Sequence, residues 1–326
     1  MYDIIGDVHG HAAELEQLLQ DLQYRQVQGV YRHSERRVIF LGDWIDRGPE
    51  IGRTLEIARS MVEAGSALAV LGNHEWNFLA FHTPDPAEQG AFLRRHTRKN
   101  LQQNQETRQQ LSYADLRSSL EWFRTLPLWL DLPGVRIVHA CWDPEALEVL
   151  SGWTSRSERH SDEFLVESCR PDSPVLSALE VTLKGKELAL PAGLAFHDKD
   201  GHARSQTRVR WYRDPHGLTY GEYAWNDSVS CDTPLEPEVV TQARPYMETE
   251  KPLFLGHYWL RAERPAILAT NVACVDYGVA KGGLLCAYRW QGEQRLTNDH
   301  FAWVPSRDAL RSPHEKLATG GDPEPS

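Results

Sequence analysis

The sequence predicts an α/β fold, and two features of residues 1–82 support this prediction. Short apolar runs alternate with amphipathic segments, which is the βαβαβα order of an α/β domain. Each apolar run ends at a glycine that polar side chains follow. Functional groups of such sheets collect at the carboxyl ends of the strands. The sequence therefore predicts a functional site at one edge of a sheet.

Three strand–helix units make up this first part of the chain. We expect strands at three apolar runs: residues 2–6, 37–42 and 67–72. We expect helices at the segments that follow them: residues 12–22, 49–65 and 73–82. The second of these helical segments opens with proline and closes with glycine, as helices commonly do.

The remaining residues are expected to complete one domain that spans residues 1–305. Residues 83–112 are polar and rich in Arg and Gln, and we expect a helical insertion on the surface. Residues 151–191 are irregular and charged, and we expect a second insertion. Further strand-like runs occur at residues 135–143, 252–257, 266–278 and 282–290. Residues 306–326 are polar and contain Pro and Gly, which predicts a disordered tail.

The composition narrows the function classes. A net charge of −11 argues against a surface that coats long nucleic acid, which requires a basic face. It is compatible with a small phosphorylated substrate, because a metal site supplies local positive charge. No run of 18 apolar residues and no signal peptide are visible, so we expect a cytoplasmic protein without a membrane span. The five cysteines show no CxxC spacing and are expected to be free thiols.

Six polar side chains follow the apolar runs, most of them beside a glycine: Asp7, His9, Asp43, Asn73, His139 and His257. This mixture of oxygen and nitrogen donors suits Mn, Fe or Zn rather than a calcium cage or a thiolate zinc site. Six donors are too many for one catalytic ion that keeps an open position. They suit two ions that share a carboxylate, about 3.5–4 Å apart, which can activate a bridging hydroxide and hold a phosphoryl group.

The motifs around these residues resemble those of calcineurin-like metallophosphoesterases. The motifs occur in the family's order: GDVHG (6–10), GDWIDRG (42–48), GNHE (72–75), VHA (138–140) and GH (256–257). The resemblance is close to the phosphoprotein-phosphatase branch, which includes serine/threonine phosphatases and bacterial diadenosine tetraphosphatase. It implies a four-layer αββα sandwich with two mixed β-sheets and the metals at the sheet edge.

The resemblance also implies a role for each matching residue. Asp7 and His9 would hold the first metal, and Asp43 would bridge both. The second metal would be held by Asn73, His139 and His257. The same ligands accept Mn, which we expect first, and also Fe, Zn, Co or Ni.

The GDWIDRG and GNHE motifs add three residues outside the metal shells. His74 would be the general acid that protonates the leaving oxygen, and Asp46 would orient it. Arg47 would bind phosphate oxygens through its planar guanidinium. Within GHYW, Trp259 replaces the second histidine that other branches of the superfamily carry, which favours the phosphatase branch.

Several residues keep two interpretations. Arg208 and Arg210 are candidates for a further phosphate-binding arginine, or they form a solvated pair at a strand edge. Three tryptophans near the motifs are expected to pack under the site, with base stacking by one of them as the alternative: Trp44, Trp76 and Trp142. Four histidines outside the motifs are expected on the surface: His11, His82, His197 and His202.

The predicted function is a metal-dependent phosphatase that hydrolyses phosphomonoesters of a phosphoprotein or a small molecule. One alternative keeps the chemistry but takes a symmetrical dinucleoside tetraphosphate or another nucleotide. A polynucleotide-end phosphatase is a further variant: the acidic net charge counts against it, and the Arg-rich residues 94–108 keep it open. A binding protein without catalysis is a third interpretation, and the complete residue set argues against it.

Overall fold

Two mixed β-sheets form the centre of the computed structural model, which describes residues 1–155, 159–197 and 203–307. The first sheet has the order β14-β15-β1-β4-β5, and β16 pairs with β15. Its strands are β14 (Asp276–Tyr277), β15 (Leu284–Trp290), β1 (Tyr2–Ile5), β4 (Arg37–Phe40), β5 (Ala67–Ala69) and β16 (Phe301–Pro305). β1, β4 and β5 are parallel, whereas β15 is antiparallel to β1. All three strands predicted in the first part of the chain are therefore present.

The second sheet has the order β13-β12-β7-β6. Its strands are β13 (Val272–Cys274), β12 (Leu253–Leu255), β7 (Val135–Val138) and β6 (Trp129–Leu132). β7, β12 and β13 are parallel, and β6 forms an antiparallel hairpin with β7. The prediction of two mixed sheets is confirmed.

The two sheets pack face to face through one apolar layer. Ile4 and Ile39 of the first sheet lie in the same buried cluster as Ile137 and Phe254 of the second. The neighbouring residue Ile5 belongs instead to the cluster under the helices. Because successive side chains of a strand point to opposite faces, β1 is buried on both sides, and its sequence is apolar without alternation.

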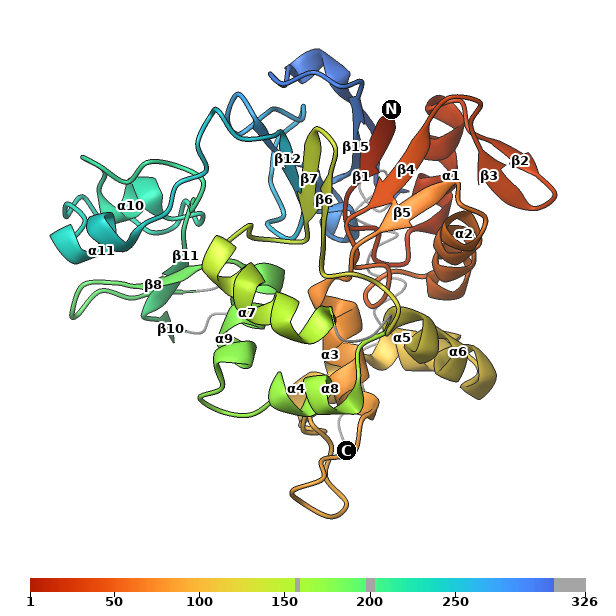
Figure 1. Ribbon diagram of the computed structural model, residues 1–326, viewed down its shortest axis with the longest axis horizontal. Helices are drawn as coiled ribbons and strands as arrows, with labels where there is room; N and C mark the ends of the chain where they lie inside the picture. Colours follow the sequence, from red (N-terminus) through yellow and green to blue (C-terminus); the bar gives the residue numbers. More distant parts are fainter. Residues whose placement is uncertain (156–158, 198–202, 308–326) are drawn as a thin grey trace, which may run out of the picture.

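Two helices cover the outer face of the first sheet, as Figure 1 shows. They are α1 (Ala12–Asp21) and α2 (Ile51–Glu63), in the positions that the sequence predicted. The hairpin of β2 (Arg25–Val27) and β3 (Val30–Arg32) lies beside them. The third predicted helix is α3 (Asn73–His82).

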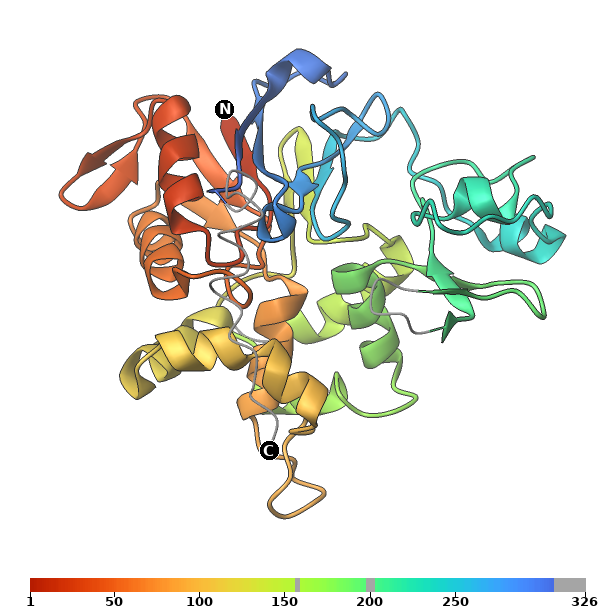
Figure 2. The same cartoon turned by 180° about the vertical axis from the view of Figure 1, so that it is seen from behind.

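The outer face of the second sheet packs against a different kind of layer. It consists mainly of buried aromatic side chains from irregular chain and short helices: Trp211, Tyr212, Tyr220, Tyr223 and Tyr246. The regular elements of this part are α10 (Tyr220–Tyr223), α11 (Pro237–Gln242), β8 (Glu187–Ala189), β9 (Phe196–His197), β10 (Ala203–Arg204) and β11 (Gln206–Arg208). Figures 1 and 2 place these elements on the side of the molecule away from α1 and α2.

Further helices lie beyond the carboxyl ends of β1, β4 and β5, in the lower half of Figure 1. They are α4 (Arg98–Gln103), α5 (Gln105–Gln110), α6 (Tyr113–Phe123), α7 (Pro144–Thr154), α8 (Asp162–Glu167) and α9 (Pro174–Lys184). Residues 151–191 were expected to be irregular, but they include α8 and α9. Leu179 and Leu183 of α9 are buried, so this segment contributes to the core.

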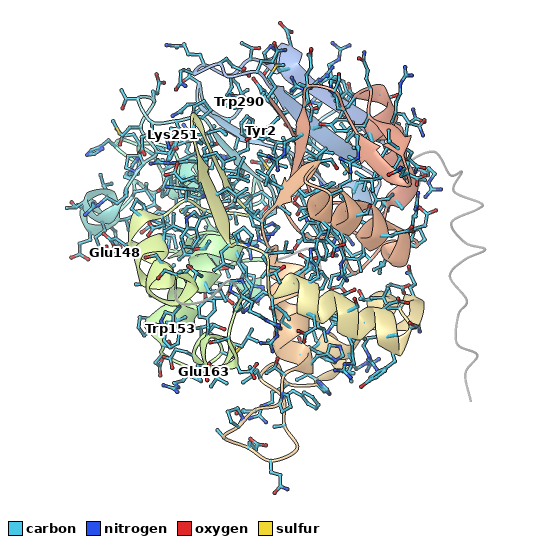
Figure 3. All side chains as sticks on the ribbon, turned by 45° about the vertical axis from the view of Figure 1, so that its right-hand side comes forward. Tyr2, Glu148, Trp153, Glu163, Lys251 and Trp290 are labelled. Carbon is cyan, nitrogen blue, oxygen red and sulfur yellow. The ribbon has the colours of Figure 1, made fainter. Side chains whose placement is uncertain are left out.

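The stacked rings of Tyr2 and Trp290 mark the end of the first sheet away from these helices, where Figure 3 labels both residues. The 3₁₀ helices are η1 (Val279–Lys281) and η2 (Asn298–His300). Most of the predicted tail lies outside the described residues. Its first residue, Ser306, is buried, and Arg307 forms ion pairs with Glu14 and Glu50. Among the described residues, no helix has the length and apolar character needed to cross a membrane.

Candidate metal and phosphate site

All six predicted metal ligands follow the carboxyl ends of strands in the two sheets. Asp7 and His9 follow β1, whereas Asp43 follows β4 and Asn73 follows β5. In the second sheet, His139 follows β7 and His257 follows β12. Since the strands of each set are parallel, these ends meet at one edge of the sandwich. The structure therefore brings the six residues together.

Two glycines allow the strand ends to approach each other. A Cβ atom on Gly72 would lie 2.2 Å from Oδ1 of Asp43, and one on Gly256 would lie 2.3 Å from Oδ1 of Asp7. Both distances are far shorter than a van der Waals contact. Any larger residue at Gly72 or Gly256 would displace a carboxylate that faces the site.

The backbone of the site is strained. Nine non-glycine residues of the described chain have a positive φ, and six of them lie here: His9, Asp43, Asp46, Arg47, His257 and Trp259. Each such residue costs about 1–3 kcal/mol, and the conformation persists only where surrounding contacts fix it. Strain of this kind is concentrated at functional sites. The strained residues lie in or next to the motifs that the sequence analysis identified.

Three acceptor atoms face one another around Asn73. Nδ1 of His139 donates to the carbonyl oxygen of Leu41 at 2.7 Å, so its Nε2 carries the lone pair. That Nε2 lies 3.1 Å from Oδ1 of Asn73 and 3.5 Å from Oδ2 of Asp43. Nδ1 of His257 lies 2.7 Å from the same Asn73 oxygen. Ligand atoms around one ion, each about 2.1 Å from it, have similar mutual separations, so a divalent cation fits among them.

His9 is oriented in the same way toward the other side of Asp43. Its Nδ1 donates to the carbonyl oxygen of Ile45 at 2.9 Å. Its Nε2 is buried without a hydrogen-bond partner and lies 3.7 Å from Oδ2 of Asp43. Burial lowers the pKa of His9 and of His139, which keeps both rings neutral and able to bind a metal. The carboxylate of Asp43 therefore lies between the neutral rings of His9 and His139.

Several carboxyl groups are buried close together at this point. Burial and the charges of Asp276 and Asp43 hold the pKa of Asp7 well above its usual range. Burial likewise raises the pKa of Asp276 to about 6 and that of Glu75 to about 8. Among the described residues, no lysine or arginine forms an ion pair with Asp7, Asp43 or Asp276. Divalent cations are the charges that would balance these carboxylates.

The ligand atoms form two groups that share Asp43. Those of Asp43, His139 and His257 lie within 4.8 Å of one another, and so do those of His9, Asp43 and His74. Asp7 is connected through its carboxylate, which accepts the backbone N–H of His257 at 3.1 Å. This bond joins the first sheet to the second at the site.

His74 and Asp46 form a buried pair beside these groups. Nδ1 of His74 lies 2.6 Å from Oδ2 of Asp46, so its Nε2 is directed away from Asp46. Burial lowers the pKa of His74, but the charges of Asp43 and Asp46 and this hydrogen bond outweigh burial and raise it. Nη2 of Arg47 lies 3.4 Å from that Nε2. The guanidinium of Arg47 also lies 4.3 Å from the ring centroid of Trp259, with which it makes a cation–π contact.

Four supporting residues were missed by the sequence analysis. The Glu75 carboxylate accepts the backbone N–H groups of Asp43 (2.8 Å) and Trp44 (2.8 Å) and so fixes the strained turn. Asp276 accepts the N–H of Trp259 at 2.8 Å. Glu75 lies in the GNHE motif, so its position was a usable signal, whereas Asp276 lies within the strand-like run 266–278. Thr107 and Gln110 of α5 contact the 46–51 segment, and no local motif marks them.

The structure separates the two candidate arginines. Arg210 forms an ion pair with Asp227 at 3.0 Å and donates to the carbonyl oxygen of Glu222. Arg208 lies near His257, because its charge is the second cause, after burial, that lowers the pKa of His257. Within the described chain, the Arg208 side chain has no hydrogen bond or ion pair, and its Nε is buried. The two arginines therefore differ in their surroundings: Arg210 has a carboxylate partner beyond the end of β11, whereas no such partner is found for Arg208 among the described residues.

The tryptophans and histidines outside the proposed ligand set differ in how deeply they are buried. Three tryptophans are buried in apolar clusters, which supports packing rather than base stacking: Trp44, Trp76 and Trp142. The surface prediction was wrong for His11, which is 3% exposed, because its turn packs against Gly48. His82 is half-buried among Phe78 and Phe81. The side chains of His197 and His202 lie outside the described residues.

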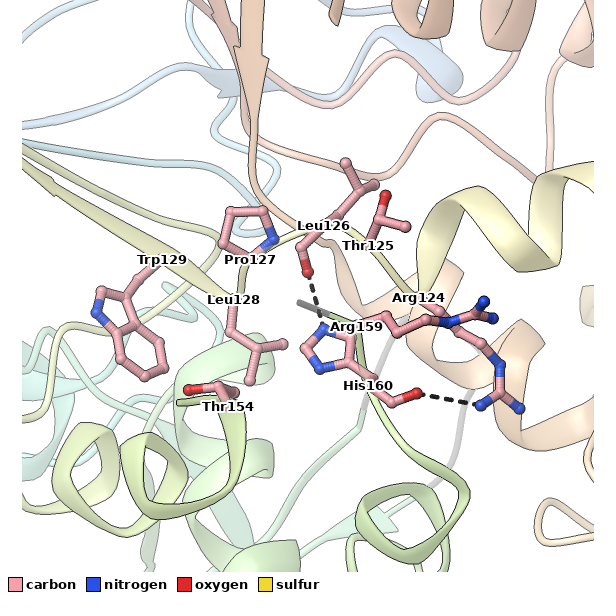
Figure 4. A pocket seen from close by; sticks show the side chains of 9 residues that line it. All are labelled: Arg124, Thr125, Leu126, Pro127, Leu128, Trp129, Thr154, Arg159 and His160. Carbon is pink, nitrogen blue, oxygen red and sulfur yellow. Dashed lines mark hydrogen bonds between the residues drawn. The ribbon is translucent and has the colours of Figure 1, made fainter. Parts of the chain in front are cut away.

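A separate pocket of about 290 Å³ lies between residues 124–129 and the chain around Thr154 and His160 (Figure 4). Its lining includes none of the candidate site residues. A ring nitrogen of His160, Nε2, donates to the carbonyl oxygen of Leu126 at 2.8 Å. Burial lowers the pKa of His160 to about 4, so the ring is neutral near pH 7. His160 thus supports the chain beside this pocket.

The two-sheet fold and the Asp, His and Asn side chains at its edge define a metal-dependent phosphoesterase. The family profile of calcineurin-like phosphoesterases matches residues 2–179, and the chain belongs to this family. It is accordingly a hydrolase of phosphoric ester bonds that uses divalent metal ions.

Two curated proteins and one solved structure illustrate what the chain is similar to. The symmetrical bis(5'-nucleosyl)-tetraphosphatase of Shewanella oneidensis is 26% identical over 303 residues, which cover 90% of this chain and 96% of that protein. The asymmetrical bis(5'-nucleosyl)-tetraphosphatase PrpE of Oceanobacillus iheyensis is 30% identical over 139 residues, 42% of this chain and 54% of that protein. A cold-active protein-tyrosine phosphatase of a psychrophilic Shewanella superposes with a TM-score of 0.47, at 16% identity, over 94% of this chain and 80% of that chain.

Proposed function

We propose that this chain hydrolyses phosphomonoesters with two divalent ions at the strand-end site. Asp7, His9 and Asp43 would hold the first ion. The second would be held by Asp43 together with Asn73, His139 and His257. Mn is the proposed native metal, and a mixed oxygen and nitrogen set also accepts Fe, Zn, Co or Ni. When bound, two such ions neutralise the phosphoryl oxygens and activate water as a nucleophile.

The observation that carries this proposal is the His74–Asp46 pair beside the ligand groups. Asp46 binds Nδ1 of His74 at 2.6 Å and stabilises its protonated form. The Nε2 atom can then give a proton to the leaving oxygen. Although Nε2 of His74 lies within 4.0 Å of Asp43, we assign it to proton transfer because its partner Asp46 raises its basicity. Asp46 acts through His74 and is a positioning residue.

Two arginines would bind the phosphate from different sides. Arg47 is exposed next to Nε2 of His74, and stacking on Trp259 limits its freedom. Arg208 approaches from the side of His257 and has no carboxylate partner in the described chain. A planar guanidinium matches two phosphate oxygens at once. Arg210 is paired with Asp227, so Arg208 is the proposed phosphate ligand of the two.

The geometry favours a monoester because a buried acid is most useful when the leaving group is poor. Serine and alkyl phosphates release an alkoxide, which must be protonated as the P–O bond breaks. The substrate would therefore be a phosphoprotein, a phosphopeptide or a small phosphorylated metabolite. The free cysteines suit a reducing compartment, which supports a cytoplasmic location.

A symmetrical dinucleoside tetraphosphate is the second candidate. The similarity to the Shewanella oneidensis tetraphosphatase extends over nearly the full length of both chains, which favours this substrate. The leaving group would then be a nucleoside diphosphate, which is a stable anion. Hydrolysis of that substrate would depend less on His74.

The test compares three substrates with Mn-loaded protein: p-nitrophenyl phosphate, a phosphoserine peptide and diadenosine tetraphosphate. Wild type and His74→Asn are measured in parallel, with bound Mn determined by elemental analysis. For a monoesterase, we expect higher kcat/KM on the peptide than on the dinucleotide. His74→Asn should keep its metals and lose about 10²–10⁴-fold in kcat on the peptide.

The loss on p-nitrophenyl phosphate should be much smaller, because its leaving group needs little protonation. Preference for diadenosine tetraphosphate with release of ADP would replace the first candidate by the second. An unchanged kcat of His74→Asn on the peptide would contradict the general-acid assignment.

A further inference from the structure

The segment 46–51 contains Asp46, which positions the proposed acid His74, and Arg47, the proposed phosphate ligand, and its backbone conformation is strained. Asp46 has a φ of 67° and Arg47 a φ of 73°, both in the left-handed region. This region is unfavourable for residues with a Cβ atom. Contacts from outside the segment must therefore hold it in place.

One such contact comes from Thr107, in the middle of α5. Its hydroxyl oxygen accepts the backbone N–H of Asp46 at 2.9 Å, and its O–H donates to Oδ1 of Asp46 at 2.5 Å. Thr107 and Asp46 are both 0% exposed, so water cannot replace this hydroxyl. The other carboxylate oxygen, Oδ2, is left to receive Nδ1–H of His74. Each of the two carboxylate oxygens of Asp46 is thus held by a hydrogen bond.

A second contact comes from Gln110, which lies three residues further along on the same face of α5. Its Nε2 donates to the carbonyl oxygen of Gly48 at 2.9 Å, and its Oε1 accepts the N–H of Ile51 at 2.8 Å. Ile51 begins α2, so this bond satisfies an N–H that has no partner within the helix. Together, the two residues bind the segment on both sides of Arg47.

We propose that Thr107 and Gln110 are positioning residues for the leaving-group chemistry, which rests on the function proposed above. They make α5 part of the catalytic apparatus, although residues 83–112 were expected to be a surface insertion. Thr107 sets the orientation of Asp46 and through it that of His74. Gln110 fixes the chain that follows Arg47. Phosphoester hydrolysis by this chain therefore depends on a helix outside the strand–helix units that supply the ligands.

The test uses substitutions that remove only the hydrogen-bonding groups. Thr107→Val replaces the hydroxyl by a methyl group of similar size, and Thr107→Ser restores it. Gln110→Met keeps the length without the amide, and Gln109→Met is its matched control, because Gln109 is exposed on the same helix. Each variant is measured for kcat and KM on the phosphoserine peptide and on p-nitrophenyl phosphate, together with Mn content and Tm.

We expect Thr107→Val to lose at least about tenfold in kcat on the peptide, with a smaller loss on p-nitrophenyl phosphate and unchanged Mn content. Thr107→Ser should recover most of this loss. Gln110→Met should raise KM on both substrates, and Gln109→Met should match wild type. An equal loss on both substrates without recovery in Thr107→Ser would overturn the proposal and leave a purely structural contact.

His74→Asn separates this proposal from the one on which it rests. If His74→Asn shows no dependence on the leaving group, the general-acid assignment fails. If His74→Asn shows that dependence but Thr107→Val and Gln110→Met behave as wild type, only the role of α5 fails. If Thr107→Val proves unfolded by its Tm, the outcome for Gln110→Met decides.

Discussion

The guanidinium carbon of Arg47 lies 4.3 Å from the centroid of the Trp259 ring. Arg47 follows β4 in the first sheet, whereas Trp259 follows β12 in the second. The stack therefore joins the two sheets across the mouth of the site. The Trp259 ring holds the Arg47 guanidinium next to Nε2 of His74 and leaves its positive charge available. A carboxylate partner would instead neutralise that charge.

Replacing Trp259 should weaken phosphate binding. In Trp259→Leu, Arg47 loses a cation–π contact of about 0.5–2 kcal/mol, so KM should rise roughly 2- to 30-fold. Steady-state kinetics on p-nitrophenyl phosphate checks this, with Trp303→Leu as control because Trp303 is exposed on β16. Equal KM values for the two variants would show that the stack does not serve binding.

Asp43→Asn should abolish hydrolysis and reduce the occupancy of both metals. The amide has no negative charge, so it cannot balance two divalent ions or share its oxygens between them. Elemental analysis should find well below one Mn per chain after gel filtration, whereas wild type retains close to two. Asp232→Asn, on the exposed surface, is the matched control and should resemble wild type. Full metal content in Asp43→Asn would contradict the bridging role.

Arg208→Ala and Arg210→Ala should differ, although they are two residues apart. A charge-assisted hydrogen bond contributes about 1.5–3 kcal/mol, so Arg208→Ala should lose roughly 10- to 100-fold in kcat/KM. Arg210→Ala loses an ion pair with Asp227 and should stay within about threefold of wild type. Measurement of kcat/KM for both variants on any monoester that the protein hydrolyses tests this prediction. The opposite order would assign the phosphate to Arg210.

His160 should make the protein less stable in acid. Its pKa is lowered to about 4 by burial, whereas an unfolded histidine titrates near 6.5. The unfolded chain therefore binds more protons between these values, and the free energy of unfolding decreases as the pH falls from 6.5 toward 4.

The loss should reach roughly 2 kcal/mol at about pH 5 relative to pH 7. His160→Gln stays neutral and should not show this part of the decrease. Urea unfolding of both proteins at the two pH values measures the difference, and His216→Gln controls for an exposed histidine. Parallel pH curves for wild type and His160→Gln would show that His160 is not the titrating group.

The convergence of the six proposed ligands was predictable because each of them lies within a few residues of a strand end. A short motif fixes such a residue relative to its strand, and parallel strands bring the ends together. Thr107 was not predictable in this way, because 61 residues separate it from Asp46 and only the packing of α5 joins them. The polar composition of its segment indicated surface, whereas the residue itself is fully buried.

The two arginines show another limit of sequence patterns. Alternation along a strand would place Arg208 and Arg210 on the same side. β11 ends at Arg208, however, and the chain then turns so that Arg210 reaches Asp227. The end of a strand this short depends on its partner β8, which the sequence did not identify as a strand.

Asn73, His74 and Glu75 are consecutive residues in the first turn of α3. One supplies a proposed ligand, the next a proton donor, and the third the carboxylate that fixes the turn after β4. Their relative positions are set by helical phase, and one added residue before Asn73 would rotate all three by about 100°. The proposed ligand, the proton donor and the carboxylate that fixes the turn therefore belong to one rigid helical turn. A shift of α3 would move all three together.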